Sequence, residues 1–246
     1  MKNKWIVVTG ASSGIGFATA KILLNNDYKV VLSSRNSRAL EEQFQSNDKE
    51  SYVIVPFDFS VIKDIKKYKE IVFSKVGKIS GLVHCAGKTD ILPLELYTYE
   101  KILGLFSTNT FSAFELIKQF VNDGFEEHGS SIVLVSSYTT REGSLGQSIY
   151  AATKGAIEGY LKSAAIELLK KNIRINVIVP GLVKSRMTEK YLNKLDENKL
   201  KKVEEKYPLG IGSPENVAGL IEFLISEKSS WMTGQQIIID GGRSLT

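Results

Sequence analysis

A tyrosine, a lysine and a serine are the residues of this chain whose types and spacing best suit catalysis. Tyr150 and Lys154 stand four positions apart, and Ser137 lies thirteen positions before the tyrosine. A phenol is a poor acid near neutrality because its ordinary pKa is about 10. On a helix, a lysine four residues on lies on the same face, where its ammonium stabilises the phenolate. Tyr150 is therefore a candidate for proton transfer, and Ser137 is a candidate for holding the oxygen that receives the proton.

The same tyrosine–lysine spacing occurs a second time, at Tyr97 and Lys101, so spacing alone does not identify the site. No serine stands at a predicted strand end beside this second pair. Tyr150, by contrast, opens a predicted helix after a strand that ends at Ser137, and small residues follow it. We therefore predict that the pair with Tyr150 is catalytic, and that Tyr97 and Lys101 are an ordinary pair at the start of a helix.

Length and charge limit the kinds of protein to which these residues can belong. The 246 residues suffice for one large α/β domain or two small ones, and 43% hydrophobic with 24% charged residues is usual for a globular protein. The net charge of +5 comes from 32 basic and 27 acidic side chains, and most lysines alternate with glutamates. Nucleic-acid binding would predict a concentrated basic stripe. We therefore expect a mixed-charge surface and no nucleic-acid partner.

The compartment is predicted from the single cysteine and from the first residues. Cys85 stands alone, so no internal disulfide can form, and a reducing compartment is the natural one. The basic start is followed by only four apolar residues, 5–8, which are too few for a signal peptide. No run approaches the roughly 20 apolar residues that a membrane span needs. These features predict a soluble cytoplasmic protein with no membrane partner.

Short β-branched runs alternate with longer helical patterns along the chain. Strands are predicted at 5–8, 29–33, 52–55, 81–84, 131–135, 173–179 and 236–239. Helices are predicted at 15–24, 37–45, 62–75, 99–122, 150–171 and after Pro214. Uniformly apolar short strands that alternate with helices predict a parallel sheet covered on both faces.

One segment, 187–206, differs from the rest because it is rich in Lys, Glu, Asn and Leu. Its spaced leucines predict one or two amphipathic helices. Such helices belong either to an ordinary surface or to a mobile lid over a substrate, and the sequence leaves both interpretations open.

A glycine-rich loop, 9–16, follows the first predicted strand. Gly10 allows a tight turn, Gly14 lets the backbone approach a pyrophosphate, and Gly16 permits close helix packing. The start of the next helix offers free N–H groups and a positive dipole end to phosphates. The loop therefore predicts a dinucleotide site. The residues assigned to it are Gly10, Ser12, Ser13, Gly14, Ile15 and Gly16.

The end of the second predicted strand bears on the choice between NAD and NADP. Dinucleotide folds that select NAD usually place an acidic residue there to hold the ribose 2′-hydroxyl. This chain has Ser34 and Arg35 instead. A guanidinium pairs with a 2′-phosphate, and no carboxylate is there to repel it, so we predict NADP(H) as the cofactor.

Further candidate residues follow the next strand ends, where ligands gather in open α/β sheets. Asp58 and the adjacent Phe59 follow the third strand, and Asp58 either accepts a bond from the adenine amino group or caps a helix. Ala86 and Gly87 end the fourth strand, where small residues let a cofactor lie against the backbone. His84, just before them, is predicted to be a structural histidine.

These residues together resemble the classical short-chain dehydrogenases/reductases over essentially the whole chain, and most closely the 3-oxoacyl-(acyl carrier protein) reductases. The resemblance implies one domain over 1–246 with a Rossmann-type, doubly wound fold. Its seven-stranded parallel sheet would have the order 3-2-1-4-5-6-7, with helices on both faces. The matching motifs are Thr9 to Gly16, Asp58, Ala86-Gly87, Asn109, Ser137, Tyr150-x-x-x-Lys154, Pro180-Gly181, Pro208 to Gly210, Gly212 to Glu215, Thr233-Gly234 and Asp240 to Gly242.

The resemblance also implies an oxidoreductase reaction with no metal. NADPH would deliver a hydride to a carbonyl carbon, Tyr150 would supply the proton, and Ser137 would hold the carbonyl oxygen. Lys154 would lower the pKa of Tyr150. Lys154 and Tyr150 would both bind the nicotinamide ribose. Asn109 would retain a water that links Lys154 to solvent. The remaining cofactor contacts would be Pro180, Gly181, Val183 and Ser185, the last at the place of a threonine that binds the carboxamide.

The chain departs from the family pattern in three places. His84 replaces an asparagine, and the arginine usual between Gly210 and Ile211 is missing. Lys171 matches a residue that binds the acidic carrier protein, but His128, preceded by two glutamates, stands at the other such position. Two carboxylates there weaken the docking of an acidic partner.

Several functions therefore stay open. The substrate is an acyl-thioester carbonyl, with the acyl carrier protein as a partner, or it is a sugar, polyol or other small ketone. A remote alternative is a non-catalytic regulator that binds a dinucleotide. Relatives usually pair through the two long helices, so the resemblance also implies a homotetramer.

Overall fold

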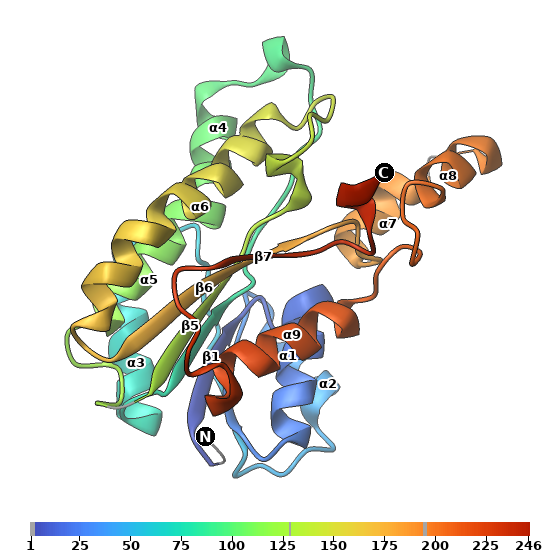
Figure 1. Ribbon diagram of the computed structural model, residues 1–246. Coiled ribbons are helices and arrows are strands. Elements are labelled where there is room, and N and C mark those ends of the chain that lie inside the picture. Colours follow the sequence, from blue (N-terminus) through green and yellow to red (C-terminus); the bar gives the residue numbers. More distant parts are fainter. Residues whose placement is uncertain (1–2, 128, 194–195) are drawn as a thin grey trace.

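The computed structural model describes residues 3–127, 129–193 and 196–246, and these form a seven-stranded sheet at the centre of the molecule (Figure 1). Neighbouring strands are parallel, and their order is β3-β2-β1-β4-β5-β6-β7, which confirms the expected fold. The strands are β1 Trp5–Thr9, β2 Lys29–Ser33, β3 Tyr52–Ile54, β4 Gly81–His84, β5 Ser130–Val135, β6 Ile173–Pro180 and β7 Gln236–Ile239.

Helices cover both faces of this sheet (Figure 1). Successive strand residues point to opposite faces, so Val7 packs with α3, α5 and α6, whereas Ile6 and Val8 pack with α1, α2 and α9. Both faces are buried in β1, β2, β4, β5 and β6, which explains why these strands read as continuous apolar runs, whereas the edge strand β7 is partly exposed. The helices are α1 Gly14–Asn25, α2 Ser37–Phe44, α3 Ile65–Val76, α4 Tyr99–Phe106, α5 Ser112–Phe120, α6 Ser148–Leu169, α7 Arg186–Leu192, α8 Glu197–Glu204 and α9 Pro214–Ile225.

The helix expected over 99–122 is interrupted in the middle. Residues Ser107–Phe111 form a π-helical turn between α4 and α5. Side-chain hydroxyls bond back to the helix there: Thr108 Oγ1 donates to the Gly104 carbonyl at 3.1 Å, and Ser112 Oγ to the Thr108 carbonyl at 2.7 Å. Such back-bonding competes with regular helix hydrogen bonds, and π turns often occur at functional sites. The prediction of one regular helix was therefore wrong at this turn.

The turn after β1 lies against the residues that follow β4. Gly10 has φ of +68°, and a Cβ on it would come within 3.0 Å of the Ala86 nitrogen and the Cys85 carbonyl carbon. The Ala86 N–H donates to Thr9 Oγ1 at 3.0 Å. Because β1 and β4 are parallel neighbours, this contact brings two predicted cofactor-binding segments to one edge of the sheet.

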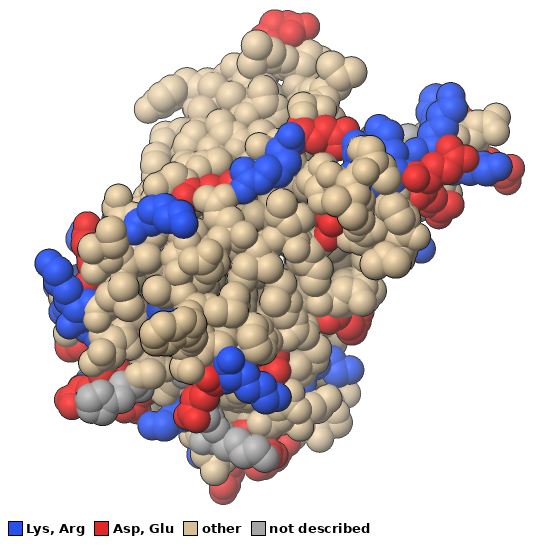
Figure 2. Space-filling model, viewed as in Figure 1, with Lys and Arg blue, Asp and Glu red and all other residues tan. Residues whose placement is uncertain are grey.

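The segment expected to be helical over 187–206 forms two helices, α7 and α8. In Figure 1, α8 projects away from the body of the molecule. In the space-filling view, basic and acidic side chains are interspersed over the visible face, as the sequence predicted (Figure 2). Within the described ranges, no helix is long and apolar enough to cross a membrane.

We expect the core around α5 to dominate stability. Leu116 is fully buried between α5 and the sheet, so Leu116→Ala should lower the free energy of unfolding by about 2–5 kcal/mol. Leu145, which is 99% exposed, is the matched control. Leu145→Ala should change the free energy of unfolding by less than about 0.5 kcal/mol. Urea unfolding measures both, and equal effects would contradict the assignment of the core.

Candidate active site

A cavity of about 990 Å³ opens at the carboxyl ends of the strands. Every residue predicted to bind the cofactor borders it, and so do Ser137, Tyr150 and Lys154. The cavity is therefore built from the strand ends that the sequence singled out, together with the segment after β6. The bordering predicted residues are Gly10, Ser12, Ser13, Gly14, Ile15, Gly16, Ser34, Arg35, Asp58, Phe59, Ala86, Gly87, Pro180, Gly181, Val183 and Ser185.

Two hydroxyl groups meet in this cavity. Ser137 follows β5 and precedes a 3₁₀ turn, where its Oγ accepts a bond from the Thr139 N–H at 3.3 Å. Tyr150 lies in the first turn of α6, and its phenol is close enough to Ser137 for that side chain to lower its pKa. Two O–H groups that converge from a strand end and a helix start can both bond one carbonyl oxygen.

Burial raises the pKa of the Tyr150 phenol, and Ser137 opposes that increase. Lys154 Nζ donates to the Val135 carbonyl at 2.8 Å and lies 5.9 Å from the centre of the Tyr150 ring. The lowering of the Tyr150 pKa by Lys154 stays a prediction.

Lys154 is itself perturbed. It is 6% exposed, and burial lowers the pKa of its ammonium to about 8. The charged form still predominates at pH 7, but a proton leaves it far more readily than it leaves an exposed lysine. Lys154 therefore combines a positive charge with the ability to exchange a proton near neutrality.

Asn109 lies in the π-helical turn and is fully buried. Its Oδ1 accepts from the Lys88 N–H at 2.8 Å, and its Nδ2 donates to the Lys88 carbonyl at 2.9 Å and to Thr153 Oγ1 at 3.0 Å. Within the described residues it does not border the cavity. The side chain holds the backbone just after Gly87 against α6, and the water-retaining role stays a prediction.

The glycine loop fits a dinucleotide. A Cβ on Gly16 would lie 2.5 Å from the Gly10 carbonyl oxygen, so the turn and the start of α1 pack as closely as the motif requires. Gly14 has φ of +55° and faces Ser185 across the cavity. In the described structure the Ser13 side chain does not cap α1, which leaves the N–H groups of the first turn for phosphates.

The Ser34-Arg35 pair lies where the sequence placed it, at the end of β2. Ser34 is buried and donates to the Asn36 carbonyl at 3.1 Å, and the Asn36 side chain caps α2. Arg35 is exposed and borders the cavity. Its side chain therefore projects from this turn at the border of the cavity.

Asp58 closes a turn and does not cap a helix, and its bond to the adenine amino group stays a prediction. Its Oδ1 accepts bonds from the Ser60 N–H at 2.9 Å and from the Ser60 hydroxyl at 2.7 Å. Burial alone would raise the pKa of its carboxyl, but these bonds, with the nearby charges of Arg35 and Lys88, lower it. The carboxylate thus closes a turn and also borders the cavity.

His84 is a structural histidine, as predicted. Its Nδ1 is 3.0 Å from Thr9 Oγ1 and its Nε2 is 3.0 Å from Ser112 Oγ. Because Ser112 donates to the Thr108 carbonyl and Thr9 accepts from Ala86, the consistent tautomer carries its proton on Nε2. The histidine therefore ties the backbone beside the cavity to the π-helical turn.

The second tyrosine–lysine pair is structural. The Tyr97 hydroxyl donates to the carbonyls of Asp90 and Gly146 at 3.1 and 3.2 Å, and so joins two loops. The Lys101 N–H is bound by the side chain of Thr98, which caps α4. Both observations agree with an ordinary pair at the start of a helix.

Comparison with known proteins identifies the family. Residues 10–244 match the family model described as enoyl-(acyl carrier protein) reductase. The chain belongs to the classical short-chain dehydrogenase/reductase family. Such a chain is an oxidoreductase that binds a nicotinamide dinucleotide, and this agrees with the cavity and the glycine loop.

Relatives match this short-chain dehydrogenase/reductase along its full length. Carbonyl reductase family member 4 of Xenopus laevis is 36% identical over 246 residues, which cover 99% of each chain. The 3-oxoacyl-(acyl-carrier-protein) reductase FabG of Thermotoga maritima is 34% identical over 245 residues, 98% of each chain. A solved structure described as SDR:Glucose/ribitol dehydrogenase, from Brucella melitensis, has a TM-score of 0.91 at 28% identity and covers 99% of this chain and 97% of its own.

Some site residues escaped the sequence analysis. The cavity lining also includes Glu142, Arg186 and Arg243, and Arg243 pairs with Glu142 at 2.5 Å. Glu158, one helical turn after Lys154, is buried, and its spacing of four from Lys154 was a usable signal. Of the two carrier-protein positions, Lys171 is exposed and His128 lies outside the described residues.

The buried neutral histidine predicts a pH effect on stability. Burial lowers the pKa of His84 to about 3, with a smaller lowering from the charge of Lys154, whereas an unfolded histidine has its usual value of about 6.5. Below pH 6.5 the unfolded chain binds a proton that the folded chain does not, so stability falls by about 1.4 kcal/mol per pH unit down to about pH 3.

The test is urea unfolding of the wild type and His84→Asn between pH 7 and pH 5. Asparagine does not titrate, so between pH 6.5 and 5 the wild type should lose about 2 kcal/mol more than the variant. Parallel stability curves for the two proteins would contradict a buried neutral His84.

Proposed function

We propose that this protein is an NADPH-dependent reductase that converts a carbonyl group to an alcohol. The observation that supports the proposal is the convergence of the Ser137 and Tyr150 hydroxyls in the cavity, next to buried Lys154. When bound, a nicotinamide cofactor supplies the hydride that reduces the carbonyl carbon.

The chain's own residues orient the substrate and deliver the proton. Ser137 and Tyr150 bond the carbonyl oxygen, and their hydroxyls stabilise the negative charge that develops there. Tyr150 then gives its proton to this oxygen. Lys154, with its pKa of about 8, stabilises the resulting phenolate and returns a proton to it.

The preference for NADPH rests on Arg35. The exposed guanidinium borders the cavity beside Ser34 and can pair with a ribose 2′-phosphate. The carboxylate that would hold the 2′-hydroxyl of NADH is replaced by Ser34 in this chain.

A 3-oxoacyl thioester is the first proposed substrate, with the acyl carrier protein as a partner. The likeness to the FabG reductase supports it. The likeness to a glucose/ribitol dehydrogenase, and the Glu142–Arg243 pair in the cavity lining, favour a sugar, polyol or small ketone as the second candidate. A non-catalytic regulator is disfavoured because Ser137, Tyr150 and Lys154 are all in place.

We also propose a cytoplasmic homotetramer. Apolar side chains on the outer faces of α4 and α6 are exposed, and contact between copies of the chain would cover them. They are Tyr99, Leu103, Ile166 and Leu169. A monomer in light scattering would refute the tetramer without touching the proposed reaction.

Tyr150→Phe tests the reaction directly. Removing the hydroxyl removes the proton donor, so kcat should fall by about 10²–10⁴-fold. The Kd of NADPH should change by no more than about twofold. Lys101→Ala, at the second pair, is the control and should keep normal turnover. Near-normal kcat in Tyr150→Phe would overturn the assignment.

The double change Ser34→Asp and Arg35→Leu tests the cofactor. A carboxylate repels a 2′-phosphate and binds a 2′-hydroxyl, so the ratio of kcat/KM for NADPH over NADH should fall by at least about tenfold. Arg38→Leu is the control, because Arg38 pairs with Glu42 on the exposed face of α2. An unchanged ratio in the double variant would contradict the choice of NADPH.

The substrate is tested by following NADPH oxidation with a 3-oxoacyl thioester, a diketone, a keto-sugar and an enoyl thioester side by side. The proposal expects the 3-oxoacyl thioester to give the highest kcat/KM and the carrier-linked form to be better still. A keto-sugar preference would favour the second candidate. Reduction of the enoyl thioester alone would contradict carbonyl chemistry.

A further inference from the structure

Three side chains occupy one face of α6 at intervals of four residues: Tyr150, Lys154 and Glu158. The first two border the cavity, and the third lies one turn further along, 7% exposed. A carboxylate buried this deeply is costly unless it is paired and hydrogen-bonded. Its partners therefore indicate what it does.

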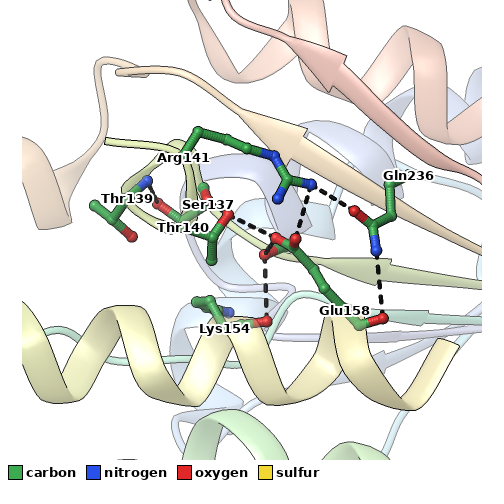
Figure 3. A network of polar contacts seen from close by, with 8 residues as sticks. Ser137, Thr139, Thr140, Arg141, Lys154, Glu158 and Gln236 are labelled. Atoms are coloured by element: carbon green, nitrogen blue, oxygen red, sulfur yellow. Dashed lines mark hydrogen bonds and ion pairs between the residues drawn. The ribbon is translucent and has the colours of Figure 1, made fainter. Parts of the chain in front are cut away.

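Glu158 is bound by the segment that carries the catalytic serine (Figure 3). Its Oε1 accepts from Ser136 Oγ at 2.5 Å and from Thr140 Oγ1 at 2.7 Å. Its Oε2 forms an ion pair with Arg141 at 2.8 Å. Three residues between β5 and α6 are thus held by one carboxylate.

The ion pair is fixed from a third element. Arg141 donates to Gln236 Oε1 at 2.5 Å, and Gln236 Nε2 donates to the Glu158 backbone carbonyl at 3.3 Å (Figure 3). Gln236 begins β7, so the network joins the segment after β5, the helix α6 and the last strand. A closed set of charge-assisted bonds resists movement of any one member.

The network brackets Ser137 without touching the substrate. Ser136 directly precedes Ser137, and Thr140 follows Ser137 by three residues. Thr140 Oγ1 is also 2.9 Å from the Ser137 carbonyl oxygen. In the described part of the chain, Thr140, Arg141 and Glu158 do not border the cavity. Glu158 therefore reaches the cavity through the residues that it binds, and Ser136, which borders the cavity, lies directly before Ser137.

We propose that Glu158, with Arg141 as its counter-ion, is a positioning residue that holds Ser137 beside Tyr150. This inference rests on the proposed function. Glu158 and Tyr150 belong to the same helix, α6. A bond between Glu158 and the segment 136–141 therefore also sets the distance between Ser137 and Tyr150.

Loss of the anchor has a distinct electrostatic signature. Ser137 opposes the effect of burial on Tyr150, so a displaced serine lets the pKa of the phenol rise further. The apparent alkaline pKa in the pH profile of kcat should then move upward. A residue that only stabilises the fold would lower Tm and leave this profile unchanged.

The experiment compares Glu158→Gln, Glu158→Leu and Arg141→Lys. Displacement by about 1 Å costs about 10²-fold in rate, so Glu158→Leu should lower kcat by roughly that factor. Glu158→Gln keeps an acceptor for Ser136 and Thr140, so its kcat should fall less than that of Glu158→Leu. Arg141→Lys keeps the positive charge, so its kcat should fall least. The Kd of NADPH should change by no more than about twofold in all three. Slower hydride transfer should also increase the isotope effect with 4-deuterated NADPH.

Glu42→Gln is the matched control, because it breaks the exposed Arg38–Glu42 pair and should leave kcat, pH profile and isotope effect unchanged. Wild-type kcat and pH profile in both Glu158 variants would overturn the positioning role, as would a lower Tm with unchanged kinetics. If Glu158→Leu does not fold, kcat and the pH profile of Glu158→Gln and Arg141→Lys still test the positioning role. The proposed function fails separately, if Tyr150→Phe retains turnover.

Discussion

The interaction between Ser137 and Tyr150 joins the end of β5 to the first turn of α6. It requires a parallel sheet, because only parallel strands bring their carboxyl ends to the edge where the connecting helices begin. It also requires that the long connection between β5 and α6 be held still. The Glu158 network, the caps of the intervening turns and the bond of Tyr97 to Gly146 all act on that connection.

The cofactor end of the cavity depends on a different constraint, the close approach of backbones. Glycine at 10 and 16 lets the β1–α1 turn pack against itself and against the residues after β4. Two buried side chains hold the residues after β4 in place. His84 bonds to Thr9 and Ser112, and Asn109 bonds to the Lys88 backbone. Buried polar groups thus surround the cavity, and the groups that face it are left to bind ligands.

The sequence predicted the sheet because both of its faces are buried, so each strand is a short apolar run that can be recognised without its neighbours. It predicted the cavity residues because motifs at strand ends come together in any such sheet. It missed the π-helical turn at 107–111, which depends on side chains of Thr108 and Ser112 bonding back to the helix. It also did not predict the bond from Lys154 Nζ to the Val135 carbonyl, because that partner is distant in sequence.

Titration of Tyr150 by NMR, with ¹³C-labelled tyrosine, measures the central interaction most directly. In the free wild-type protein the account predicts that Tyr150 titrates above the ordinary value of about 10, and that Ser137→Ala raises its pKa further. Titration of Tyr150 below 10 in the free protein, or an unchanged pKa in Ser137→Ala, would contradict the account.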